Sequence, residues 1–364
     1  MSLRSKAASV ELRRVTKAYG KVVAVRDVSF RIAPASLVTL LGPSGCGKTT
    51  TLRLIAGLEM ATSGRLLIGE ADVTRLPATD RDVSMVFQSY ALFPHMTVLE
   101  NVSYGLRVSG DPKEKAEAAA REGLALVGLT GFDDRLPSEL SGGQQQRVAV
   151  ARALVLEPQV LLFDEPLSNL DAKLRRRVRE EIRELQQRLG LTVVYVTHDQ
   201  EEALAVSDQI IVMDQAVIAQ QGTPKELYDE PGSRFVADFI GDSNLVKGTL
   251  RRLDHERAAV DLGGLEVVLP HRGVADGEVD VAIRPEALRL SSGDPPESLA
   301  GNPAKAALPG TVLKAAYLGS HIEYTVTSPV GELFVVDGAV GAPLAAGARV
   351  AIALADHGIT VVRR

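Results

Sequence analysis

The stretch GPSGCGKTT, residues 42–50, has the residue types and spacing of a phosphate-binding loop. It lies between an apolar run, residues 37–42, and a segment with helical spacing that stops at Gly57. Its glycines let backbone N–H groups surround a phosphate, and its lysine and threonine suit the β and γ phosphates and Mg²⁺. The alternative, a glycine-rich turn, is disfavoured by the flanking elements. The predicted nucleotide-binding residues are Gly42, Pro43, Ser44, Gly45, Cys46, Gly47, Lys48, Thr49 and Thr50.

A second stretch with residue types suited to catalysis is VLLFDEP, residues 160–166, an apolar strand that ends in two acids. A carboxylate at a strand end beside a phosphate loop is where Mg²⁺ needs one. We predict that Asp164 serves the metal, largely through water, together with Thr49, and that Glu165 is the general base for an attacking water. The alternative interpretation is a pair of acids in solvent, and the presence of the phosphate loop argues against it.

The stretch SELSGGQQQRVAV, residues 138–150, resembles a second anion site. Ser-Gly-Gly runs directly into a helical segment, so bare N–H groups stand at a helix start. A plain helix N-cap explains Ser141, Gly142, Gly143 and Gln144 equally well when they are taken alone. The combination of LSGGQQQR with the following DEP is far more specific.

This constellation resembles the ATP-binding-cassette (ABC) family of ATPases, over residues 8–240. In that family the phosphate loop of one subunit and the LSGGQ loop of its partner bind the same ATP. The resemblance therefore implies a head-to-tail homodimer with two ATP molecules between subunits, and Ser141, Gly142, Gly143 and Gln144 would meet the partner's γ-phosphate.

Further residues are assigned by the same resemblance. Tyr19 matches an aromatic that stacks on adenine, and Gln88 matches a glutamine that touches Mg²⁺ and the attacking water. Asp171 matches a loop that crosses the dimer interface, and His198 matches a histidine that contacts the γ-phosphate. A tyrosine in a strand or a histidine at a strand end is otherwise more often structural. Gln145, where relatives often have arginine, is expected on an exposed helix face.

The implied fold is α/β: a P-loop NTPase with a RecA-like parallel sheet, an N-terminal antiparallel β subdomain and a helical subdomain at about 89–157. Alternating apolar strands and helical segments agree with this. Strands are expected at 8–40, 159–165, 191–199 and 209–214, and helices at 112–128, 144–156, 171–190, 223–230 and 233–241. Beyond 245, short alternating segments predict an all-β, OB-like module with a polar loop at 291–304. The expected domains are 1–240 and 245–364.

Composition limits the function classes. The 364 residues carry a net charge of −5, whereas nucleic-acid binders are normally basic. The single cysteine, Cys46, excludes a disulfide framework and fits a reducing compartment. The N-terminus lacks a secretion signal, and no run reaches the roughly 18 apolar residues of a membrane helix. We expect the protein at the cytoplasmic face of the cell membrane, attached through partners.

Two stretches, 85–107 and 197–231, resemble ATP-binding subunits of bacterial importers for sugars, polyamines, ferric iron, sulfate or phosphonates. The module containing VDVAIRPEALRL, residues 279–290, resembles the TOBE domain of those subunits and is expected to brace a dimer or to sense solute. The 235–246 junction favours iron, polyamine or aminoethylphosphonate systems.

The expected partners are a second copy, membrane permease subunits and, indirectly, a solute-binding protein. Residues 88–103 should form a groove for the permease, lined by some of Ala91, Leu92, Phe93, Met96 and Val98. The alternatives are an exporter ATPase, or a soluble cassette ATPase acting on nucleic acid or the ribosome. The latter proteins carry tandem cassettes, coiled coils or zinc modules, which this sequence lacks.

Overall fold

The computed structural model describes residues 6–168, 170–293, 307–339 and 341–363. These residues form two compact units, Met1–Pro224 and Lys225–Arg364. Most of the polar loop predicted at 291–304 lies outside the described residues. No described helix is long and apolar enough to cross a membrane.

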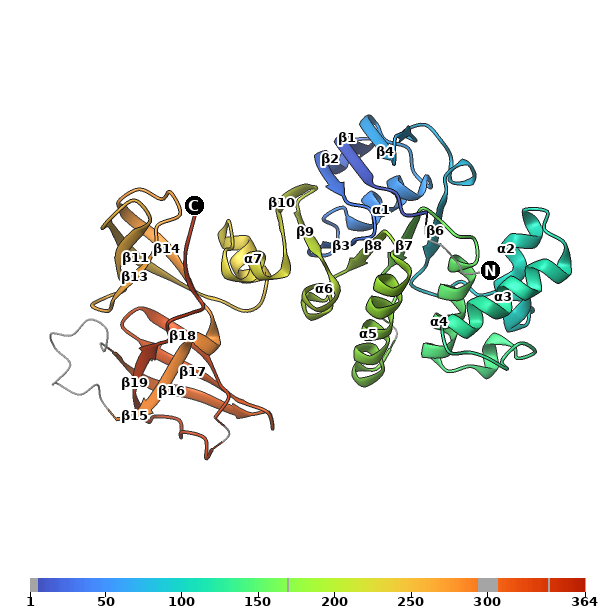
Figure 1. Cartoon of the computed structure of the whole chain (residues 1–364). Coiled ribbons are helices and arrows are strands. Elements are labelled where there is room, and N and C mark those ends of the chain that lie inside the picture. The colour runs from blue at the N-terminus through green and yellow to red at the C-terminus, as the bar shows by residue number, and fades with distance from the viewer. Residues whose placement is uncertain (1–5, 169, 294–306, 340, 364) are drawn as a thin grey trace. The chain divides into compact units, whose positions relative to one another are not determined.

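The first unit is built on a six-stranded sheet in the order β10-β9-β3-β8-β7-β6, in which only β10 is antiparallel to its neighbour (Figure 1). This confirms the predicted parallel sheet and its buried strands. The strands are β3 Leu37–Leu41, β6 Val83–Val86, β7 Val160–Asp164, β8 Val193–Thr197, β9 Gln209–Asp214 and β10 Val217–Gly222.

Side chains alternate between the two faces of this sheet, because successive residues of a strand point to opposite sides. Leu40, Leu162 and Val194 pack with α1, Lys48–Ala56, in one core. Leu161 and Tyr195 pack on the other face with α5, Ala172–Leu189. Figure 1 shows α1 and α5 on opposite faces. Burial on both faces explains why the central strands β3, β7 and β8 are almost entirely apolar, whereas the edge strand β10 is not.

A second, antiparallel sheet in the order β2-β1-β4-β5 shares the core with α1. It confirms the predicted N-terminal β subdomain. Its strands are β1 Val10–Tyr19, β2 Val22–Ile32, β4 Ser63–Ile68 and β5 Ala71–Asp72.

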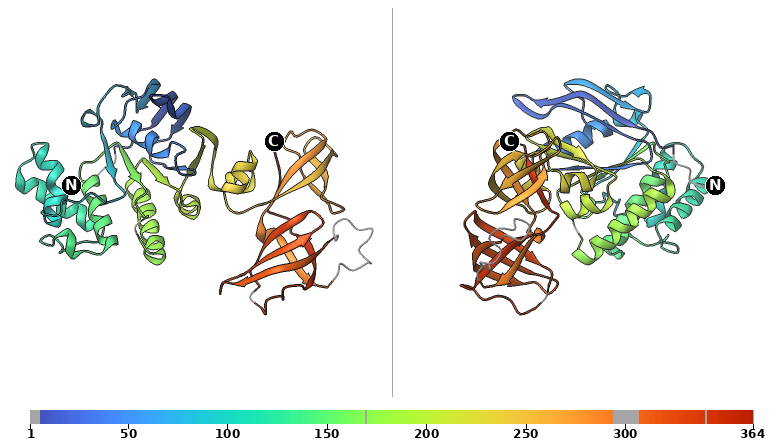
Figure 2. Two further views of the ribbon diagram at one scale, coloured as in Figure 1. Left: turned by 180° about the vertical axis from the view of Figure 1, so that it is seen from behind. Right: turned by 60° about the vertical axis from the view of Figure 1, so that its left-hand side comes forward.

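Three helices form a separate apolar cluster and confirm the helical subdomain; they appear together in teal and green in Figure 2. They are α2 Val98–Val108, α3 Lys113–Leu126 and α4 Gly142–Leu154. The sequence analysis did not predict α2, although Thr97 and Glu100 form a capping box at its start. Among the residues expected to line a groove, Val98 is fully buried in the helical core, whereas Ala91 is exposed.

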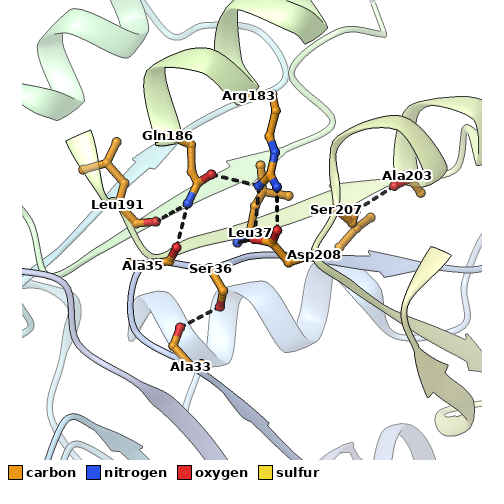
Figure 3. Close-up of polar contacts among 11 residues, drawn as sticks. Ala33, Ala35, Ser36, Leu37, Arg183, Gln186, Leu191, Ala203, Ser207 and Asp208 are labelled. Atoms are coloured by element: carbon orange, nitrogen blue, oxygen red, sulfur yellow. Dashed lines mark hydrogen bonds and ion pairs between the residues drawn. The ribbon is translucent and has the colours of Figure 1, made fainter. Parts of the chain in front are cut away.

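The C-terminal part of α5 is tied to the start of β3 by a polar cluster that Figure 3 shows. Arg183 pairs with Asp208 at 2.5 Å, and the same carboxylate accepts from the Leu37 N–H at 2.8 Å. Gln186 donates to the carbonyls of Ala35 and Leu191, each at 2.9 Å. These bonds satisfy backbone groups at the amino ends of β3 and β8 and hold the long helix against the sheet. The short helix α6, Gln200–Val206, precedes β9.

The second unit contains two five-stranded antiparallel sheets around one core and confirms the all-β module. Its strands are β11 Asn244–Arg252, β12 Arg257–Asp261, β13 Glu266–Pro270, β14 Gly277–Ile283, β15 Leu288–Ser292, β16 Leu308–Tyr317, β17 Ile322–Ser328, β18 Gly331–Asp337, β19 Arg349–Leu354 and β20 Ile359–Val362.

The helices α7, Pro224–Asp229, and α8, Arg234–Phe239, group with this β module rather than with the sheet that precedes them. The buried Arg284 explains the grouping. Its guanidinium donates to the carbonyls of Tyr228 at 2.5 Å and Ala237 at 3.0 Å, and stacks over the Tyr228 ring. One β-module side chain therefore satisfies carbonyls of both helices.

Candidate functional site

The phosphate loop joins β3 to α1 and needs glycine where the backbone passes close to other segments. A Cβ on Gly47, which has φ +108, would lie 2.3 Å from the Ala24 carbonyl oxygen. Gly47 is also the N-cap of α1 and makes no side-chain cap hydrogen bond. The N–H groups at this helix start therefore remain suited to an anion, as the sequence predicts.

Lys48, in the first turn of α1, is only 5% exposed. Its ammonium donates to the carbonyls of Gly42 at 2.7 Å and Pro43 at 2.9 Å, so it lies over the loop that was predicted to hold phosphates. Cys46 is buried within the same loop, with its Sγ 3.9 Å from the Lys48 Nζ.

The parallel register brings the predicted groups to one edge of the sheet. Leu41, the last residue of β3, pairs with Thr197, and Asp164 pairs with Val196 on the other side of β8. The phosphate loop, Asp164 and His198 thus leave the carboxyl ends of three neighbouring strands, which is where open α/β sheets bind ligands.

Asp164 has the environment of a carboxylate that would gain from a cation. Burial raises its pKa, Glu165 adds to the rise, and Arg53 and Lys48 oppose it. No hydrogen bond or ion pair of its side chain occurs in the part of the chain that the structure describes. A bound divalent cation would offset this desolvation, so the site fits Mg²⁺.

Glu165 and His198, which the sequence analysis assigned separate roles, are in direct contact. The His198 Nδ1 lies 3.1 Å from the Glu165 Oε2. Glu165 adopts a left-handed φ of +44° while its N–H donates to the Val196 carbonyl at 3.0 Å. Such a conformation in a residue other than glycine is strained, and strain of this kind clusters at functional sites.

Gln88 joins this pair through a serine that the sequence analysis missed. The Gln88 amide donates to the Ser168 hydroxyl at 3.2 Å, and that hydroxyl donates to the Glu165 carbonyl at 3.1 Å. A small cavity of about 70 Å³ lies next to Glu165, Ser168 and His198. Gln88 follows β6 at the carboxyl ends of the strands, so it is linked through Ser168 to the main chain of Glu165.

A second missed residue, Arg175, connects two loops of the site. It donates to the Leu170 carbonyl at 3.1 Å, next to Asp171, and to Asp199 at 3.3 Å, next to His198. Its position in a run of arginines gives no sequence signal, because the contacts arise only when α5 packs beside β8.

The LSGGQ segment begins α4. The Ser141 hydroxyl accepts from the Gln144 N–H at 3.4 Å, and the Gln144 side chain accepts from the Ser141 N–H at 2.9 Å. Gly142 and Gly143 occupy the first two helical positions, whose N–H groups lack intrahelical partners. Within the described residues, no hydrogen bond joins this segment to the phosphate loop.

Three further predicted positions have clear surroundings. Asp171 is the N-cap of α5 and accepts from the Leu174 N–H at 3.0 Å. Tyr19 ends β1 with 45% of its surface exposed, which leaves a ring able to stack on a base. The expectation for Gln145 was wrong: it is half-buried and donates to the Pro137 carbonyl at 2.9 Å.

Comparisons with known proteins agree with this geometry. Residues 25–168 match the model of the ABC transporter family, and residues 281–362 match the TOBE domain. The "Fe(3+) ions import ATP-binding protein FbpC" of Rhizobium etli is 57% identical over 97% of each chain. The protein of the same name from Brucella abortus is 57% identical over 98% of each chain. The chain belongs to the ABC transporter family.

As a member of this ABC family it binds and hydrolyses ATP, which confirms the predicted enzyme class. Two solved structures share the fold of its first unit. The ATP-binding cassette MJ0796, described as a dimer in a post-hydrolysis state bound to ADP and Pi, is 33% identical with a TM-score of 0.53, and the match covers 59% of this chain and 98% of that one. The structure of cbiO1 from Clostridium perfringens is 28% identical with a TM-score of 0.57, covering 61% of this chain and 90% of that one.

Proposed function

We propose that this ABC ATPase is the ATP-hydrolysing subunit of a bacterial importer of ferric iron. The observation that carries the proposal is 57% identity, across 97% of both chains, to a relative named as an Fe(3+) ions import ATP-binding protein. The sequence analysis left iron, polyamines and aminoethylphosphonate open, and these relatives favour iron.

The chemistry we propose is transfer of the γ-phosphoryl group of ATP to water. Glu165 accepts a proton from the attacking water, and His198, 3.1 Å from it, orients the carboxylate and contacts the γ-phosphate. Lys48 and the backbone N–H groups of residues 42–50 stabilise charge on the phosphates, and Tyr19 stacks on adenine. Thr49, Asp164 and Gln88 would hold Mg²⁺, which supplies further neutralisation of phosphate charge.

The proposed working unit is a homodimer. The N-terminus of α4 carries Ser141, Gly142, Gly143 and Gln144, of which Ser141 is exposed, yet it has no hydrogen bond to this chain's own phosphate loop in the described structure. A second copy placed head to tail would bring this segment to the other γ-phosphate, with Asp171 crossing the interface. The dimer described for MJ0796 with ADP and Pi supports the arrangement.

The proposed partners are membrane permease subunits and, through them, a solute-binding protein, with no nucleic acid. This places the ATPase at the cytoplasmic face of the cell membrane as a peripheral subunit. We propose an ATP-binding domain at 1–240, including a helical subdomain at about 89–157, and a TOBE-like domain at 245–364. The helices α7 and α8, which come last in the first of these ranges, pack with the second compact unit.

The mechanism is tested by comparing Glu165→Gln with wild type in light scattering with ATP and Mg²⁺. The amide keeps the shape of the side chain but accepts no proton, so we expect a long-lived dimer without hydrolysis. Hydrolysis at the wild-type rate would remove Glu165 from the role of base. A variant that binds ATP yet stays monomeric would show that the permease must template the dimer.

The substrate is tested separately in cells. Deletion of the gene should abolish uptake of radioactive ferric iron, and wild type but not Glu165→Gln should restore it. If iron uptake survives the deletion while polyamine or phosphonate uptake is lost, the proposed substrate is wrong and the ATPase mechanism stands.

A further inference from the structure

A cavity of about 700 Å³ opens where α3, α4 and α5 meet in the first unit. Its apolar wall is formed by Val127 after α3, Val150 of α4, and Val178, Ile182 and Leu185 of α5. None of the residues proposed to bind ATP lines it. The volume is within the range of small-molecule sites, roughly 300–1,000 Å³.

A buried amide in the wall lacks a partner. Gln146, on α4, is 0% exposed, and neither its Nε2 nor its Oε1 has a hydrogen bond among the described residues. A buried polar group without a hydrogen bond destabilises the protein. A ligand with a polar group that reaches Gln146 would offset this cost, which a purely apolar ligand would not do.

The rim of the cavity carries more positive than negative charge. Arg147 and Arg177 share one oxygen of Glu181, at 2.5 Å and 3.1 Å. Arg188 donates to a main-chain carbonyl at 3.1 Å, and Glu184 is the second acid of the lining. Because two guanidinium groups share a single carboxylate oxygen, the rim favours an additional anion.

We propose that this cavity is a regulatory binding site for a small anionic amphiphile. The apolar body would lie among the valine and leucine side chains, the anionic group at the arginine rim, and a polar group against Gln146. The cavity lies between α4, whose N-cap is Ser141, and α5, whose N-cap is Asp171. A ligand in the cavity would stabilise the present distance between α4 and α5 relative to other distances that the two helices adopt during turnover. We therefore expect it to slow ATP hydrolysis.

Binding is tested with the full chain and two probes of this chemical class. The first is 8-anilinonaphthalene-1-sulfonate, followed by its fluorescence, and the second is decanoate as a competitor. We expect saturable one-site binding that Arg188→Glu weakens about tenfold, because it removes a charge-assisted contact at the rim. Gln146→Leu should weaken binding of the sulfonate several-fold. The control is Arg176→Glu, an exposed arginine of α5 that does not line the cavity.

The outcomes separate the possibilities. If Arg188→Glu and Gln146→Leu, shown to be folded by circular dichroism, bind the sulfonate like Arg176→Glu, the probe occupies another apolar surface and the site is refuted. If binding follows the prediction but saturating decanoate leaves ATP turnover unchanged, the regulatory role is refuted. The effect on turnover rests on the proposed function, whereas the binding does not. A chain that binds the probe but never hydrolyses ATP would refute the function alone.

Discussion

Arg175 provides the sharpest test of how the site is held together. Its guanidinium bridges the Leu170 carbonyl, beside Asp171, and the Asp199 carboxylate, beside His198. Replacement by methionine keeps an unbranched apolar stem in place of the arginine methylenes and removes both hydrogen bonds. We expect the histidine to lose its fixed position relative to Glu165, while the phosphate loop stays intact.

The magnitude follows from the geometry. A hydrogen bond to a charged group contributes about 1.5–3 kcal/mol. The Arg175 side chain is 35% exposed and its bonds are 3.1 and 3.3 Å long, so solvent screening places the loss near the lower limit. If the whole loss of about 1–2 kcal/mol is added to the activation free energy of hydrolysis, kcat falls roughly 5–30-fold.

The assay is steady-state ATP hydrolysis with separate determination of kcat and KM. Arg175→Met should lower kcat and change KM less than about twofold, since the residue touches no predicted phosphate ligand. Arg176→Met is the matched control, because this next residue is exposed and, among the residues that the structure describes, pairs only with Glu180, at 3.5 Å. Arg175→Lys should be intermediate. If both methionine variants are folded and share one kcat, Arg175 does not position His198.

Three other predictions follow from single contacts. Gly47→Ala places a Cβ 2.3 Å from a backbone carbonyl, so titration with a fluorescent ATP analogue should show affinity reduced more than about tenfold; unchanged affinity would contradict the close approach of the loop to Ala24. Burial raises the pKa of Asp208, but hydrogen bonds from Arg183 and the Leu37 N–H outweigh that effect, so its pKa is lowered overall. Its contribution to stability is present above about pH 4 and is lost as pH falls through the lowered pKa, so urea unfolding should show Asp208→Asn approaching wild type in acid. Arg284→Met leaves several carbonyls unsatisfied, and hydrogen exchange in α7 and α8 should rise about a hundredfold, whereas the exposed Arg289→Met should change nothing there.

Several elements could be predicted because their signals are local. Apolar runs such as 159–165 are buried on both faces of the sheet, and a glycine at residue 57 ends α1 through its left-handed conformation. The helix α2 was missed although a capping box marks its start, since the region 88–103, which overlaps its first turns, was interpreted as a docking groove. Val98 shows the reason: spacing alone does not tell which apolar residue turns inward.

The chemical groups of the site were determined by the sequence itself. Lys48 begins a helix, Asp164 ends a strand and Glu165 follows it, and local spacing predicts these three. His198 was assigned only through the family resemblance. Only the tertiary structure decided which of them touch. The 3.1 Å contact between Glu165 and His198 and the bridge by Arg175 join residues far apart in the chain. Such contacts depend on the register of β7 beside β8 and on the packing of α5, which no local propensity encodes.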